Sequence, residues 1–260
     1  MLLGTIVAGS SVASPEHNIT VAIVGDSLAP SAQVWAACEQ AAAWATIIVV
    51  PPGILGVCDD AGQSAASAKS HRPILVGCRA TPAAAVSARL TDATGTQVML
   101  GNRSGSAVAT LQVQDATTNI TIGTAIGDEL WDPLLPRELM LHGAEFIINL
   151  AQPAAMRSEG LRAAAGATPG ARAGAQATPE ATAGAQATPE EAMLLTRGFE
   201  NVAAVLRASA SGSALANWCN DMLPTGCDMG SRFIAVEKIG RNVSRVSFSL
   251  QQLRAQRQGT

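Results

Sequence analysis

Cysteine is the side chain in this sequence best suited to nucleophilic chemistry, and the chain has five of them among its 260 residues. A cysteine attacks as the thiolate, so its surroundings must favour the charged form. Cys58 precedes Asp59 and Asp60, whose negative charges disfavour a thiolate beside them. Cys78 ends an apolar run and is expected to be a small core residue. Cys58 is therefore only a weak candidate nucleophile.

The other residues that bind metals or cofactors are scattered. Cys219 and Cys227 are too far apart for Cys-x-x-Cys chemistry, and no second pair of ligands accompanies them. The three histidines, His17, His71 and His142, fall in separate segments and are expected to have capping or surface roles. No glycine-rich phosphate loop joins a strand to a helix. We therefore expect no metal and no cofactor.

Charge and hydropathy exclude two classes of partner. The formal net charge is −3, with 20 acidic and 17 basic residues, and the basic residues are spread along the chain. This distribution predicts no nucleic acid binding and no polybasic membrane contact. The longest apolar runs, such as residues 46–52, are shorter than the about 20 residues of a membrane-spanning helix. We expect a soluble protein.

The cysteine count bears on the cellular compartment. An odd number of cysteines spread over a long chain favours a reducing compartment over a disulfide framework, so the prediction is cytoplasmic. The first 14 residues are apolar but lack the basic start of a secretory signal. Asn-x-Ser/Thr triplets begin at Asn18, Asn102, Asn119 and Asn242, and they matter only if the chain is secreted. We interpret them as chance.

Apolar patterning predicts elements for a mixed α/β sheet. Residues 20–24 and 46–50 are apolar or β-branched throughout, and helical spacing lies between them from Ser31, as in a β-α-β unit with buried parallel strands. Residues 86–100 and 109–126 each show alternating apolar and polar residues on both sides of a turn, which predicts two antiparallel hairpins. A short helix at 133–142, a buried strand at 146–150 and closing strands near 232–236 and 246–250 complete the series.

Composition also divides the chain. Residues 1–17 form an N-terminal extension to a domain at 18–257. Within that domain, residues 154–187 consist mainly of Ala, Gly, Thr and Pro, and ARAGAQATPE at 171–180 is nearly repeated at 181–190. So short a repeat lacks the large apolar residues of a stacking unit, which predicts a disordered or loosely helical insertion. A capping box at 188–191 then predicts a new helix start.

Two segments resemble the nitrilase superfamily of carbon–nitrogen hydrolases. IGDELWDPLLPRELMLHGAEFIINLA, at 126–151, is similar to the stretch around that family's nucleophile, where a strand ends in Ile-Cys-Tyr-Asp and Gly-Ala-Glu opens the next strand. LLTRGFENVAAVLRAS, at 194–209, is similar to its Arg-Ala-x-Glu-Asn helix and following strand. The resemblance covers most of residues 18–257. It implies a four-layer α-β-β-α sandwich with mixed sheets, and a homo-oligomer or a complex with a protein partner.

The resemblance also shows which functional groups are missing. In the family a Cys attacks a nitrile or amide carbon, a Glu serves as general base and a Lys stabilises the developing charge. The Glu position falls on Pro52 and the Cys position on Gly127. The segment that carries the Lys is shortened to residues 101–106. The substitutes that remain are Arg103 in that segment, Cys58, and Glu129 beside the former nucleophile position.

Three hypotheses about function follow from the resemblance. The first is a catalytically inactive nitrilase-like protein with a structural or regulatory role and no small-molecule substrate. The alternative is a divergent amidase or nitrilase that hydrolyses a non-peptide C–N bond through the replaced residues. A decayed gene product without a selected function is the third, because a fold does not carry activity when the site is absent.

Overall fold

The computed structural model describes most of the predicted domain. The described residues are 18–25, 30–101, 107–112, 119–152, 193–194, 196–198, 201, 203–210, 214–217, 236–239 and 242–258. The N-terminal extension, the insertion at 154–187 and the capping box at 188–191 lie outside them, as do Arg103, Cys219 and Cys227.

Seven strands form the first sheet, in the order β11-β12-β1-β2-β3-β4-β5. Their bounds are β1 Asn18–Val24, β2 Ile47–Val50, β3 Ile74–Arg79, β4 Val86–Thr91, β5 Gln97–Gly101, β11 Val236–Ile239 and β12 Val243–Ser249. β1, β2 and β3 run parallel, whereas the remaining neighbours are antiparallel. The β-α-β unit and the β4–β5 hairpin predicted from the sequence are confirmed. β12 pairs with β1, so the two ends of the described chain meet in this sheet.

Five strands form the second sheet, in the order β10-β9-β8-β7-β6. Their bounds are β6 Ala107–Gln112, β7 Asn119–Ile126, β8 Phe146–Leu150, β9 Ala204–Ala208 and β10 Ala214–Asn217. β6 and β7 form the second predicted hairpin, and β7, β8 and β9 run parallel. The carboxyl ends of three neighbouring strands therefore lie along one edge of this sheet.

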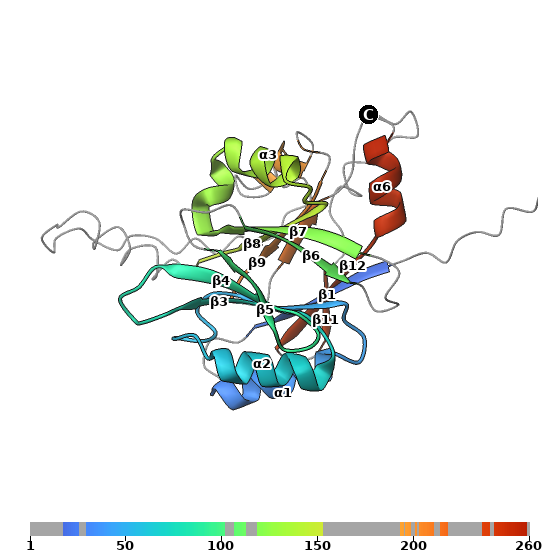
Figure 1. Ribbon diagram of the computed structural model, residues 1–260. Coiled ribbons are helices and arrows are strands. Elements are labelled where there is room, and N and C mark those ends of the chain that lie inside the picture. The colour runs from blue at the N-terminus through green and yellow to red at the C-terminus, as the bar shows by residue number, and fades with distance from the viewer. Residues whose placement is uncertain are drawn as a thin grey trace, which may run out of the picture.

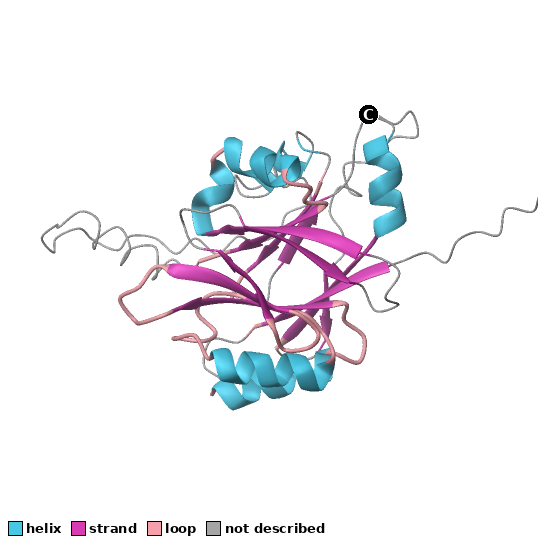
Figure 2. Cartoon of the chain, viewed as in Figure 1, coloured by secondary structure: helices cyan, strands magenta, loops and turns pink. Residues whose placement is uncertain are grey.

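The helices cover the outer faces of both sheets (Figures 1 and 2). α1 (Ser31–Ala41) and α2 (Asp60–Ser70) lie against the first sheet, and α3 (Leu134–Leu141) and α6 (Leu250–Gln258) lie beyond the second. The result is the predicted four-layer α-β-β-α sandwich. Within the described ranges, no helix combines the length and the apolar composition that crossing a membrane requires.

Burial on both faces explains why the central strands are apolar throughout. In β1, Ile19, Val21 and Ile23 belong to the core between the sheets, whereas Ala22 and Val24 pack with α1 and α2. Phe146 of β8 and Phe248 of β12 meet across the inter-sheet core, with ring centroids 4.8 Å apart. Ala, Val, Leu and Ile fill most of that core, as the low aromatic content requires.

α2 is the helix that the sequence pattern did not predict. It contains mainly Ala, Ser and Gly, so it presents no stripe of large apolar residues. Its start is fixed by Asp59, whose carboxylate accepts a hydrogen bond from the Gly62 amide at 2.9 Å. Gln63 attaches the helix to the sheet, because its side-chain amide donates to the carbonyl oxygens of Ile74 at 2.8 Å and Arg89 at 3.0 Å.

Candidate functional site

The carboxyl end of β7 turns sharply at Gly127. This residue has φ +57, in the left-handed region that glycine adopts without steric penalty, and a 3-10 helix, η1 (Gly127–Trp131), follows. A Cβ placed on Gly127 would lie 3.1 Å from Cδ and 3.2 Å from Cγ of Gln152. The space beside the position that resembles the family's nucleophile is thus occupied by the Gln152 side chain.

A buried polar network fixes the backbone of this elbow. Asn149 of β8, fully buried, donates from its side-chain amide to the Gly127 carbonyl oxygen at 3.0 Å. Its own side-chain oxygen accepts a hydrogen bond from Arg207 Nη1 at 3.0 Å. Arg207 is 6% exposed and is the cross-strand partner of Asn149 in β9. The network therefore links the ends of β7, β8 and β9, which carry the elbow.

The side chains around η1 also form hydrogen bonds with backbone groups at its two ends. Glu129 accepts a hydrogen bond from the Ile126 amide at 2.8 Å, which closes the turn after β7. Arg197, from the segment that follows the insertion, donates to the carbonyl oxygens of Leu130 at 3.1 Å and Trp131 at 2.9 Å. Glu129 was a candidate substitute base, and in the structure its carboxylate caps a helix start.

Pro52 lies two residues beyond the end of β2, which belongs to the other sheet, and is buried. A Cβ added to Gly77 of β3 would lie 2.6 Å from both Cγ and Cδ of the Pro52 ring. The ring thus lies directly against the backbone of the neighbouring strand, which only glycine permits at this distance. A proline ring neither accepts nor donates a proton, so this strand end offers no general base.

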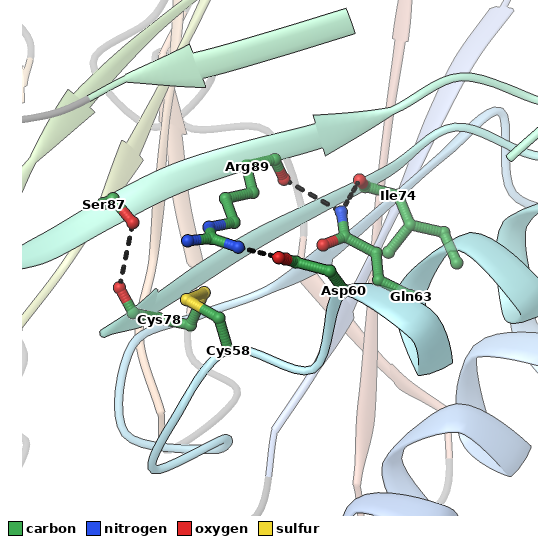
Figure 3. Close-up of a disulfide and its surroundings, with 7 residues drawn as sticks. All are labelled: Cys58, Asp60, Gln63, Ile74, Cys78, Ser87 and Arg89. Carbon is green, nitrogen blue, oxygen red and sulfur yellow. Dashed lines mark hydrogen bonds and ion pairs between the residues drawn. A yellow bond between two sulfur atoms is a disulfide. The ribbon is translucent and has the colours of Figure 1, made fainter. Parts of the chain in front are cut away.

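A disulfide joins Cys58 to Cys78, with an S–S distance of 2.07 Å (Figure 3). It connects the loop after β2 to the end of β3, and the Cys58 amide donates to the Arg79 carbonyl oxygen at 2.8 Å in the same place. The prediction that these cysteines are unpaired is therefore wrong. While the bond is closed, Cys58 has no thiol, and its assignment as a weak substitute nucleophile is corrected.

The charged groups near the disulfide form ion pairs on the α2 side of the sheet. Arg89 of β4 pairs with Asp60 in the first turn of α2, as Figure 3 shows. Lys69, at the other end of that helix, bonds Glu39 of α1 at 2.7 Å and is 70% exposed. These contacts attach helices to each other and to the sheet.

Cys38 is the free cysteine within the described ranges. Burial, reinforced by the charge of Glu39, raises the pKa of its thiol to about 12. It is therefore a neutral thiol at pH 7 and packs in the core under α1. Arg103 is the remaining predicted substitute and lies outside the described residues. Where the chain is described, no three His, Cys, Asp or Glu side chains gather as metal ligands would.

Asn149 and Arg207 are the site residues that sequence reasoning missed. Each is the single strongly polar residue of a strand that is otherwise apolar, FIINL and AVLRA. A polar residue in a fully buried strand requires a partner, and this was the available signal. Identifying the partner needs the pairing of β8 with β9, which the sequence alone does not provide.

Adding a methyl group at the elbow tests this geometry. Gly127→Ala is expected to lower the free energy of unfolding by about 1–2 kcal/mol, because alanine is strained at positive φ and its Cβ contacts Gln152. Gly56→Ala is the control, since a Cβ there meets nothing within 4 Å. Urea denaturation of both variants measures the difference. Equal stabilities would contradict the described elbow.

Comparison with known proteins identifies the fold of the chain. No protein-family model matches the sequence, and no curated protein matches it by sequence. Solved structures do match. An amidase of Nesterenkonia from the nitrilase superfamily has a TM-score of 0.55 and 10% identity, covering 93% of this chain and 95% of that one. For a carbon–nitrogen hydrolase from Helicobacter pylori the TM-score is 0.61, the identity 11% and the two coverages 94% and 93%; for Nit3 of Saccharomyces cerevisiae, of the nitrilase superfamily, they are 0.54, 12%, 94% and 94%. The chain therefore has the nitrilase fold of carbon–nitrogen hydrolases over nearly its full length.

Proposed function

We propose that this chain is a nitrilase-fold protein that has lost the family's catalysis and has a structural or regulatory role. The observation that carries the proposal is the filled space at Gly127, where the Gln152 side chain lies 3.1 Å from the position of a missing Cβ. Replacing a cysteine by glycine would by itself leave an empty space that a substrate could enter. Here the Gln152 side chain packs into that space and reduces its size.

The chemistry of a structural neighbour indicates what this change removes. In one variant of the Nesterenkonia amidase, the acetamide moiety of fluoroacetamide is added covalently at the active-site cysteine. Such an adduct needs a cysteine sulfur as the nucleophile. By the resemblance in sequence, Gly127 takes the place of that cysteine here, and glycine has no side chain to form the bond.

The alternative function is that of a divergent amidase or nitrilase. Its support is that the structural neighbours are named as amidases and carbon–nitrogen hydrolases. It requires replaced residues to act, and Glu129 already caps the turn after β7. Arg103 would have to supply the positive charge. Turnover of nitriles or amides by the unmodified protein would favour this alternative.

A structural or regulatory role requires a binding partner, either a second copy or another protein. Three large apolar side chains at η1 and α3 support this, because Trp131 is 45% exposed, Leu134 63% and Leu141 76%. Leu134 and Leu141 are seven residues apart and so lie on one face of α3. We define these three residues as the α3 patch. Purification from native cells, with mass spectrometry of co-purifying proteins, tests for a partner in stable proportion.

The α3 patch predicts self-association when no other partner is present. The chain has a mass of 26.4 kDa, and light scattering is expected to give twice this value or more. Leu134→Glu with Leu141→Glu should shift the protein to the monomer mass, because burying two carboxylates in an apolar interface is unfavourable. Val57→Glu with Val98→Glu is the control, since both valines are 43% exposed and lie elsewhere. A strict monomer at micromolar concentration, with no partner recovered from cells, would contradict a subunit role.

A further inference from the structure

The Cys58–Cys78 disulfide carries information about the compartment in which this chain folds. Structural disulfides persist in oxidising compartments and are rare where glutathione and thioredoxin keep thiols reduced. Cys78 is 2% exposed and Cys58 is half-buried, so this disulfide is part of the packed structure. It argues against the cytoplasmic location predicted from the cysteine count.

In an oxidising compartment of the secretory route, Asn-x-Ser/Thr triplets can act as acceptors for N-glycosylation. Asn18 and Asn119 begin the triplets Asn-Ile-Thr at 18–20 and 119–121, and both asparagines are exposed. Each is the first residue of a strand, β1 and β7 respectively. The next residue, Ile19 or Ile120, points into the core between the sheets. Strand alternation therefore directs each asparagine to the helix-bearing side of its sheet (Figure 1), and at the first strand position both remain exposed, so a bulky group can project into solvent. The Asn119 backbone carbonyl oxygen accepts a hydrogen bond from Arg254 Nη2 of α6.

The other triplets differ in their surroundings. Asn242 is half-buried in the turn before β12, and Ser244 of its triplet is fully buried. Asn102 lies outside the described residues. Of the three triplets that the structure describes, those at Asn18 and Asn119 have the exposed asparagines.

We propose that this chain matures in an oxidising compartment and carries N-linked glycans at Asn18 and Asn119. The disulfide forms when two thiols lose two protons and two electrons to a disulfide-exchange oxidant, which is reduced to a dithiol. Each glycan comes from a lipid-pyrophosphate-linked oligosaccharide. The bond from the sugar C1 to the phosphate oxygen breaks, a bond from C1 to the asparagine Nδ2 forms, and the lipid pyrophosphate leaves with the amide proton.

The full chain isolated from its native cells tests the proposal. Without reduction, peptide mapping is expected to show the Cys58–Cys78 linkage and no alkylation of either residue. Peptide:N-glycanase should lower the mass by two glycans and convert Asn18 and Asn119 to aspartate. A disulfide-bonded chain without glycans would overturn the proposal. So would a chain in which both cysteines alkylate before reduction.

Variants expressed in the same cells separate glycosylation from effects on folding. Thr121→Ala should remove one glycan, because the triplet at Asn119 is lost, whereas Thr121→Ser keeps the triplet and should keep both glycans. Thr20→Ala and Thr20→Ser form the matched pair for Asn18. A chain that keeps both glycans after Thr20→Ala or Thr121→Ala would overturn the assignment of the acceptor.

Discussion

Asn149→Leu is expected to lower the free energy of unfolding by about 3 kcal/mol, a large part of the stability of a domain of this kind. Leucine has a similar volume, so the change removes hydrogen bonds and leaves little cavity. The Gly127 carbonyl oxygen loses its donor at 3.0 Å, and Arg207 loses the acceptor of its Nη1 at 3.0 Å. Because Arg207 is 6% exposed, water replaces that acceptor poorly.

A double-mutant cycle measures the coupling inside this network. Arg207→Met removes the buried charge. In that background, Asn149→Leu should lower the free energy of unfolding by roughly 1–2 kcal/mol less than it does in the natural protein. Lys69→Ala is the control, because its bond to Glu39 lies on the surface and should contribute about 0.5 kcal/mol or less. Urea denaturation gives all four values. An Asn149→Leu protein as stable as Lys69→Ala would show that the network does not support the elbow.

Loss of the Cys58–Cys78 disulfide is expected to lower the free energy of unfolding about as much as Asn149→Leu does. The bond closes a loop of 20 residues in the unfolded chain, and the entropy of that constraint corresponds to about 3 kcal/mol of stability. Cys58→Ala with Cys78→Ala should show this loss in urea denaturation. Amide hydrogen exchange should accelerate most in the loop after β2, since the disulfide and the Cys58 amide attach it to β3.

Reduction provides the control for this prediction. A reductant should shift the denaturation midpoint of the natural protein to that of the double alanine variant. The same reductant should leave the double variant unchanged. The denaturation midpoint of the Cys38→Ala variant should shift with the reductant as that of the natural protein does, because Cys38 is a buried free thiol and forms no disulfide. A natural protein whose midpoint ignores the reductant would contradict the disulfide.

The central strands could be predicted from the sequence because burial determines their composition, whereas β10 (Ala214–Asn217) was not predicted. Residues such as Ile47–Val50 are apolar on both faces, and this pattern is read without knowing which strand lies beside which. The elbow at Gly127 could also be anticipated, since a glycine after a strand permits the positive φ. α2 could not, because its small residues have no helical stripe and its position depends on contacts of Gln63 with two strands.

The disulfide and the polar network depend on pairing that a single sequence does not contain. Five cysteines allow many pairs, and only the folded chain brings the Cα atoms of Cys58 and Cys78 to 5.1 Å. Asn149 and Arg207 are 58 residues apart in the chain and become neighbours through the register of β8 with β9. Local composition marks Asn149 and Arg207 as polar residues in apolar strands, but it does not identify their partners.

A hydrolysis assay tests whether this nitrilase-fold protein has lost catalysis, as we propose. Purified protein is incubated with nitriles, primary amides and carbamoylated amines, beside a buffer blank and an active amidase of the same fold. The expected result is no ammonia or carboxylate above the blank, because Gly127 and Pro52 supply neither nucleophile nor base. Pro52→Glu with Gly127→Cys should also remain inactive, since residues 101–106 provide no lysine. Turnover by the unmodified protein would contradict the proposal, and turnover retained after Cys58→Ala and Glu129→Gln would show that neither residue is its source.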